Sequence, residues 1–265
     1  MRRDYIFWGA VLILLGGLMF ANAAGIHLPG GINAMQLFWP SVLVLLGMWI
    51  LSGYFLRGSV EDEQVSIDLQ GANEASLKLS HGAGRIILSA GASSNQLLSG
   101  TFAGGVKQSA RKSGDRLDAH IEAQPTFFQP FVGGSQGLEW KIDLNREIPL
   151  TLRLETGASQ SELDLRDLRV TALKINTGAS KIDLTLPANA GMTTVKVEMG
   201  AASLDMVVPD GVAARVHAEQ GVSAIEVDTV RFPYANGIYE SVDYSSAQNK
   251  VDVMIQAGVG QVVIH

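Results

Sequence analysis

The stretch that decides the fold is ALKINTGASKIDLTLP at residues 172–187, followed by TVKVEMGAASLDMVVP at residues 194–209. The two segments align about a glycine, which is Gly178 in the first and Gly200 in the second. On each side of the glycine, apolar and polar residues alternate with a period of two, which indicates β-strands. Each segment is therefore predicted to form two strands joined at a corner of small residues.

The same unit recurs along the chain. TLRLETGAS starts at Thr151 and RVHAEQGVSAIEV starts at Arg215, and more distant copies surround two further glycines. The predicted corners are Gly82, Gly157, Gly178, Gly200, Gly221 and Gly258. The central four are 21, 22 and 21 residues apart, and a fixed period of this length indicates a stacked repeat. Glycine is expected at these corners because it tolerates a positive φ.

Apolar residues recur at fixed offsets from each glycine, as at Leu173, Ile175, Ile182 and Leu184 around Gly178. One unit cannot bury such a face alone, whereas stacked units bury it against one another. Residues 61–265 are therefore predicted to form an all-β domain, a single-stranded-type β-solenoid of ~21-residue repeats. Loop insertions are expected at 125–137 and 231–248.

Two outward positions of the repeat are charged in most units. The fourth residue before the glycine is Lys78, Arg153, Lys174, Lys196, His217 and then Met254. The fifth residue after it is Asp183, Asp205 and Glu226, joined by Asp164 after a short insertion. Stacking would turn these into a basic row and an acidic row of solvated charge pairs. The alternative is a carboxylate ladder that binds cations or a basic partner. Ile87 and Val263 replace the acid in the two outlying units, which predicts covered or capped ends.

Residues 1–60 form a different region, in which Arg2, Arg3, Asp4 and Arg57 are the charged residues. The uncharged stretches at about 5–26 and 35–56 are long enough to cross a ~30 Å hydrocarbon core. They predict a two-helix transmembrane hairpin that precedes the solenoid. The arginines flank the outer ends of the hairpin, so the positive-inside bias predicts a cytoplasmic location for the large domain.

A signal peptide is the alternative interpretation of the first stretch. Arg2 and Arg3 would form its basic region, and Ala21-Asn22-Ala23 resembles a cleavage site. Its apolar stretch is long for that role, and a second apolar stretch follows at once. The predicted location of the large domain is the same under both interpretations.

Composition excludes several functions. The net charge of −6 argues against sequence-independent nucleic-acid binding, which needs a basic face. The absence of cysteine excludes disulfides, thiolate metal sites and a cysteine nucleophile. The histidines lack the spacing of metal ligands, and no phosphate-binding loop or nucleophile elbow is present. The sequence thus predicts a protein that is not an enzyme and has no catalytic, metal or cofactor site.

Two segments interrupt the repeat and are candidate contact surfaces. The segment 125–137 contains Phe127, Phe128 and Phe131, and it follows a basic cluster that includes Arg111, Lys112 and Arg116. These aromatic residues either cover an open end of the solenoid or contact a bilayer or a partner. The second segment contains Phe232, Tyr234, Tyr239 and Tyr244. Its aromatic residues are expected to pack on the last coil, with a partner surface as the alternative.

Several motifs resemble known bacterial proteins. WGAVLILLGGLMF and LFWPSVLVLLGMWIL, with Trp39-Pro40 in the second, resemble the two-span membrane region of LiaF-like and LiaI-like proteins. LEWKIDLNREIPLTLRLETGAS at 138–159 and the GAS repeats resemble the toast-rack, adhesin-like β-domain found behind such spans. The closing segment 239–265 resembles the end of that domain. The resemblance implies a protein of the bacterial cell membrane and envelope, in a family that includes inhibitors of histidine kinases responding to cell-wall stress.

The functional prediction combines the residues with this resemblance. The chain is expected to be a non-enzymatic, membrane-anchored sensor, regulator or scaffold of the cell envelope, which modulates a stress-signalling partner. The alternatives are a scaffold that assembles through its solenoid ends and an extracytoplasmic glycan-binding or adhesin-like domain. The expected partners are the lipid bilayer and either a membrane protein or further copies of the chain, without nucleic acid.

Overall fold

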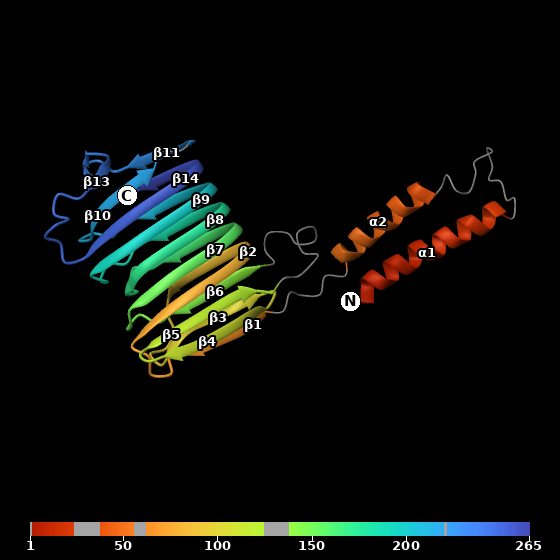
Figure 1. The fold of residues 1–265 in the computed structure, drawn as a ribbon, viewed down its shortest axis with the longest axis horizontal. Coiled ribbons are helices and arrows are strands. Elements are labelled where there is room, and N and C mark those ends of the chain that lie inside the picture. The colour runs from red at the N-terminus through yellow and green to blue at the C-terminus, as the bar shows by residue number, and fades with distance from the viewer. Residues whose placement is uncertain (1, 24–37, 56–61, 125–137, 220–221) are drawn as a thin grey trace. The chain divides into compact units, whose positions relative to one another are not determined.

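The structure is a computed structural model that describes residues 2–23, 38–55, 62–124, 138–219 and 222–265. The chain divides into two units (Figure 1). One contains the helices α1 (Arg2–Ala23) and α2 (Phe38–Phe55). The other contains every strand in the described part of the chain.

The helices overturn the predicted membrane anchor. No helix in the described ranges is both long enough and apolar enough to cross a membrane. Helix α2 has 18 residues, a length of about 27 Å that falls short of a ~30 Å hydrocarbon core. Helix α1 has 22 residues but begins with Arg2, Arg3 and Asp4. The predicted two-helix transmembrane hairpin is therefore wrong. The predicted two-span location in the bacterial cell membrane, with a cytoplasmic large domain, is overturned with it.

The strands confirm the all-β part of the prediction. Their bounds are β1 (Asp62–Asp68), β2 (Glu74–Ala90), β3 (Gln96–Ala103), β4 (Val106–Ser113), β5 (Arg116–Ala123), β6 (Glu139–Leu144), β7 (Leu150–Asp164), β8 (Val170–Thr185), β9 (Met192–Val207), β10 (Ala213–Glu219), β11 (Val222–Val227), β12 (Tyr234–Ala235), β13 (Ile238–Glu240) and β14 (Lys250–Ile264). All of them belong to one continuous sheet.

Five long strands form the stack. Strands β2, β7, β8, β9 and β14 are 15 to 17 residues long and pair in parallel in that order (Figure 1). Each contains one of the predicted corner glycines near its middle, and equivalent repeat positions pair in register, as Lys78 with Arg153 and Arg153 with Lys174. One long strand with a central corner is thus one coil of the predicted solenoid.

The spatial order of the coils differs from their order in the chain. The C-terminal strand β14 lies between β9 and the coil formed by β10 and β11. The unit around Gly258 is therefore an inner coil, and the unit around residue 221 lies at the end of the stack. Strand β2 is also covered, because β5 and β6 pair along its other edge. The coil with Ile87 is thus a covered end, as predicted, whereas the coil with Val263 is not an end of the stack, so that part of the prediction is wrong.

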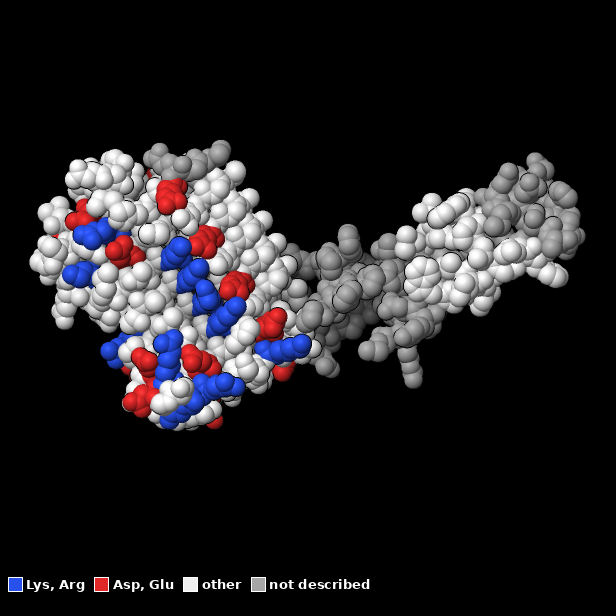
Figure 2. Space-filling view, viewed as in Figure 1, with Lys and Arg blue, Asp and Glu red and all other residues white. Residues whose placement is uncertain are grey.

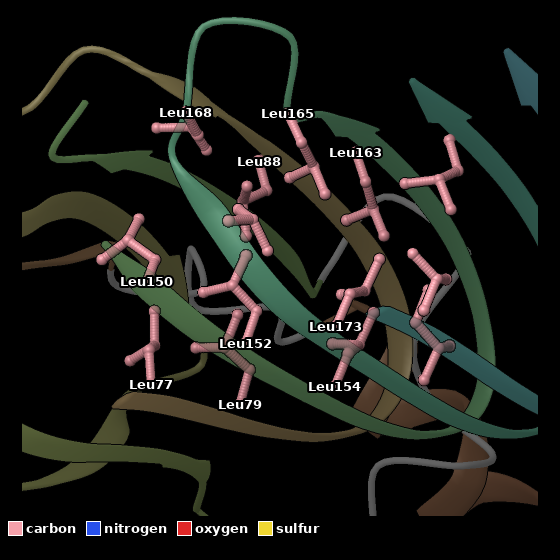
Figure 3. Close-up of a cluster of buried hydrophobic side chains, with 14 of the residues drawn as sticks. Leu77, Leu79, Leu88, Leu150, Leu152, Leu154, Leu163, Leu165, Leu168 and Leu173 are labelled. Carbon is pink, nitrogen blue, oxygen red and sulfur yellow. The ribbon is translucent and has the colours of Figure 1, made fainter. Parts of the chain in front are cut away.

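The apolar core lies between the two halves of the coils. The residues before each corner form one wall and the residues after it form the other, with their apolar side chains facing inward. Figure 3 shows leucines of both walls pointing toward one another, among them Leu77, Leu152 and Leu173 before the corners and Leu88 and Leu163 after them. Leu173, Ile182 and Leu184 are at most 3% exposed. The repeat offsets therefore identified the core correctly.

Candidate functional site

The corner glycines stack directly on one another. A Cβ atom on Gly178 would lie 2.8 Å from the carbonyl oxygen of Gly157, and one on Gly200 would lie 2.9 Å from that of Gly178. Gly258 approaches Gly200 in the same way, at 2.7 Å. Such distances to backbone are shorter than real Cβ contacts. These positions require glycine because the backbones of successive coils approach closely there.

Positive φ is not the reason for these glycines, contrary to the expectation. Among the described residues, positive φ near the corners occurs two positions later, at Gly84 (φ 141°) and Gly260 (φ 148°). There the backbone conformation itself disfavours other residues. The predicted corner Gly221 lies outside the described residues.

The predicted rows of charged side chains are present, and most of these side chains form ion pairs with other residues of the chain. Figure 2 shows Lys and Arg side chains in a line across the strands, with Asp and Glu beside them. Lys78 bonds Glu155 at 2.8 Å and Lys196 bonds Glu198 at 2.7 Å. These lysines lower the pKa of both glutamates through hydrogen bonds. Because β14 is inserted, Met254 interrupts the basic row between Lys196 and His217.

Glu162 pairs in register with Asp183, whereas Asp164 pairs with Thr185. The predicted place of Asp164 in the acidic row is therefore wrong, because the coil has no insertion there and Glu162 takes that position.

The acidic row is paired as well. Glu162 bonds Arg85 at 2.5 Å, Asp183 bonds Lys181 at 3.4 Å, and Asp205 lies 3.2 Å from His265. No group of three or more candidate metal ligands occurs within the described ranges. Both rows thus form solvated charge pairs. Lys181–Asp183 and Lys196–Glu198 lie within one strand, whereas Lys78–Glu155 and Arg85–Glu162 join neighbouring strands.

A polar hollow lies beside the first corners. Its volume is about 880 Å³, and it crosses the neighbouring strands β1, β3, β6, β2 and β7. Its charged and polar lining includes Asp62, Arg85, Thr101, Glu139, Lys141 and Gln160. Two of these side chains are cationic and two are anionic, so the lining is formally neutral. The hollow therefore offers hydrogen-bond donors and acceptors without a net charge.

Ion pairs hold the cations of this lining in place. Arg85 bonds Glu162 at 2.5 Å and lies 3.8 Å from Glu139, and Lys141 bonds Glu139 at 3.0 Å. The hydrogen bond that Arg85 donates to Glu162 raises the pKa of Arg85 above its usual value. Lys141 keeps 65% of its side chain exposed, so its ammonium group can donate further hydrogen bonds to a ligand.

A buried histidine lies behind the wall of the hollow at Gly84. A Cβ on Gly84 would lie 2.7 Å from Nε2 of His81, which is 3% exposed. The His81 ring packs on Trp140 with a centroid distance of 4.3 Å. Neither ring nitrogen makes a hydrogen bond of normal geometry to a described residue. Burial lowers the pKa of His81 to about 4, although the nearby backbone of Leu138 acts in the opposite direction.

The predicted basic cluster lies on the hairpin of β4 and β5. Lys112 donates to the carbonyl of Gln70 at 2.6 Å, Arg116 bonds Asp118 at 3.0 Å, and Arg111 lies opposite Asp118 in the ladder. The predicted contact residues Phe127, Phe128 and Phe131 lie outside the described residues.

The predicted tyrosine surface lies on the small hairpin of β12 and β13. Tyr234 and Tyr239 pack together with ring centroids 4.7 Å apart, and Tyr234 is 55% exposed. Phe232 and Tyr244, from the same insertion, are buried. The insertion thus packs partly on the β10 coil, as expected, and leaves one tyrosine accessible.

Sequence reasoning missed the hollow. Its lining comes from strands β1, β3 and β6, which lie outside the repeat and whose neighbours in space cannot be deduced from the period. One signal was available. Gly84 and Arg85 occupy positions at which the next coil has Ser159 and Gln160, so the first coil departs from the repeat where the hollow lies.

A protein-family model matches the part of the chain that forms the hollow and most of the coils. The model of the N-terminal domain of toast_rack, DUF2154, matches residues 56–207, more than half of the chain. The chain belongs to this family. The toast-rack match covers the stacked coils β2, β7, β8 and β9 and every residue that lines the hollow. No curated protein matches the chain.

Two solved structures resemble the toast-rack chain. A candidate cell adhesion protein from Clostridium sporogenes is 25% identical, with a TM-score of 0.69, and the likeness covers 77% of this chain and 98% of that one. A candidate adhesin from Bacteroides fragilis is 8% identical, with a TM-score of 0.31 and coverage of 77% and 97%. The second likeness is too weak to carry an argument. The first supports the same fold over nearly the whole length of the other protein. These comparisons do not include a LiaF-type membrane region.

Proposed function

We propose that this toast-rack chain is a non-enzymatic, adhesin-like binding protein that recognises a glycan in the hollow beside Arg85 and Lys141. The observation that carries the proposal is the likeness to a candidate cell adhesion protein over 98% of that chain. The chemistry of the hollow supports the choice of ligand.

Most small-molecule pockets are apolar with a few polar groups. This hollow instead has charged and polar side chains from five neighbouring strands, with Asp62 and Glu139 balancing Arg85 and Lys141. A formally neutral lining rich in donors and acceptors suits an uncharged ligand with many hydroxyl groups. A saccharide has this chemistry, and rigid strands present the side chains at fixed positions.

A glycan array followed by calorimetry tests the proposal. The full chain is screened against bacterial surface polysaccharides and peptidoglycan fragments, and the dissociation constant is measured for each hit. Lys141→Ala is expected to weaken binding about tenfold, the effect of losing one hydrogen bond from a charged donor. Lys181→Ala is the matched control, because Lys181 is similarly exposed (60%) and paired, with Asp183, but does not line the hollow.

Equal thermal stability of both variants shows that the fold is intact. Absence of binding to every glycan, or equal weakening by the two substitutions, would overturn the proposal. The sensor or regulator role implied by the LiaF resemblance stays a prediction, and capture of a signalling kinase by crosslinking in cells is its test.

A further inference from the structure

Strand β11 is an open edge at the end of the stack. Within the described residues it pairs with β14 alone. The other half of the same coil is capped, because β13 pairs with β10 at Arg215 and Val216, and Ser241 bonds the backbone nitrogen of Ala214 at 2.9 Å. The insertion after β11 therefore caps one wall of the solenoid and leaves the other uncapped.

The burial of equivalent positions shows what the missing neighbour leaves uncovered. In the inner coil β8, Ile182 and Leu184 are 1% and 2% exposed. Their counterparts on β11, Ile225 and Val227, are only half-buried. Val230, three residues beyond the strand, is 92% exposed. Apolar surface thus accompanies the unpaired backbone groups, a combination that favours pairing with another strand.

The ladder fixes which backbone groups face outward. The N–H of Asp228 donates to the carbonyl of Ile264 on β14. Because backbone groups alternate along a strand, those of Glu226 and Ala224 also face β14. The N–H and C=O groups of Ser223, Ile225 and Val227 therefore face the open edge.

We propose that β11 pairs with β11 of a second copy of this chain, antiparallel and about a two-fold axis at Ile225. This register places the three outward-facing residues opposite one another, with Ser223 opposite the second copy's Val227. Glu226 then lies opposite Ala224, and both are exposed on the same face. No two charges lie directly opposite each other, so the edge is complementary to itself, as a two-fold interface requires.

Strands β1 and β4, which each have one neighbour among the described strands, fit β11 less well. Strand β1, the edge at the far end of the same wall, contains Asp62, Glu63 and Asp68, which would repel Glu226 and Asp228 in a head-to-tail stack. Strand β4 contains lysine and arginine side chains, a common protection of edge strands. If β11 paired with β1 or β4 of a second copy, each assembly would still have an unpaired β11 at one end. Further copies could then add, which gives open filaments rather than a closed dimer.

Sedimentation velocity of the full chain over a range of concentrations tests the proposal with a matched pair of substitutions. Ala224→Glu places a like charge opposite Glu226, and Ala224→Lys places an opposite charge there. Each contact occurs twice in a two-fold dimer, so the first substitution is expected to raise the dimer dissociation constant about tenfold and the second to lower it. Both leave the backbone ladder to β14 in place.

A monomer–dimer equilibrium that shifts in opposite directions with the two substitutions supports the proposal. A monomer at all concentrations, open filaments, or a dimer that responds equally to both substitutions would overturn it. Association through any other part of the chain, including α1 and α2, would give a dimer that responds equally to both substitutions. Glycan binding by the same variants is measured in parallel, and because the hollow lies at the other end of the stack, it is expected to be unchanged. The two proposals can therefore fail separately.

Discussion

At the scale of single residues, the corner glycines set how closely the coils stack. The backbone oxygen of one glycine occupies the place where a Cβ of the next would lie, from Gly82 through Gly157 and Gly178 to Gly200. Any larger residue must push two coils apart along a rigid ladder, where neither backbone can move alone. The repeat thus retains glycine for lack of space rather than for backbone conformation.

Gly178→Ala is therefore expected to lower the free energy of unfolding by about 2 kcal/mol, the usual cost of overpacking. Gly82→Ala is the matched control, because a Cβ there would meet no described atom within 4 Å. It should be neutral or slightly stabilising, since alanine restricts the unfolded chain. Urea denaturation of both variants gives the comparison. Equal losses at the two positions would contradict the stacking argument.

His81 makes stability depend on pH. Its pKa is about 4 in the folded protein, below the usual value of 6.5 for histidine, so below pH 6.5 the unfolded chain binds a proton more readily than the folded protein does. The contribution of His81 to the free energy of unfolding is fully present above pH 6.5 and is lost as the pH drops toward 4. The loss is up to about 3 kcal/mol. His81→Phe keeps the packing on Trp140 and removes the titration, so it should flatten this part of the profile. An unchanged slope between pH 7 and pH 4.5 would be evidence against a buried neutral imidazole.

At the scale of elements, the placement of β14 determines which strand ends the stack. Every coil presents the same apolar offsets inward, so the hydrophobic pattern allows β14 to pair with any other coil. Its outward positions distinguish it. Met254 and Val263 replace the charges found in other coils, and β14 lies where it separates Lys196 from His217 and Asp205 from Glu226.

The fold could be predicted from the sequence where the pattern is local. Alternation around Gly178 and Gly200 predicted the strands, their inward faces and the stacked repeat. The order of the coils could not be predicted, because parallel coils of equal pattern are interchangeable. The hollow could not be predicted either, because Glu139, which contacts Arg85, and Lys141, which contacts Glu139, lie on a strand outside the repeat. For the helices, the count of uncharged residues was the misleading signal, since the helix that forms in the second stretch has 18 residues.

At the scale of the whole β-unit, the stack has two different ends. One carries the inserted strands β1, β3 and β6 and the hollow they form with β2 and β7. The other carries the half-capped coil with the free edge of β11. A dimer through β11 would join two copies at the ends that lack the hollow. Each dimer would then present two ligand sites, and a multivalent glycan could bind more tightly than either site alone allows.

Strand β14 lies inside the stack and leaves β11 at its end. Disulfide formation tests this placement directly, because the chain contains no cysteine. Lys196 and Met254 are register neighbours, and His217 is the next neighbour beyond Met254. Neighbouring strands are about 4.8 Å apart and a disulfide needs Cα atoms within about 7 Å. Oxidation should therefore link Lys196→Cys to Met254→Cys and not to His217→Cys. A disulfide in the Lys196→Cys/His217→Cys protein, without one in the Lys196→Cys/Met254→Cys protein, would contradict the account.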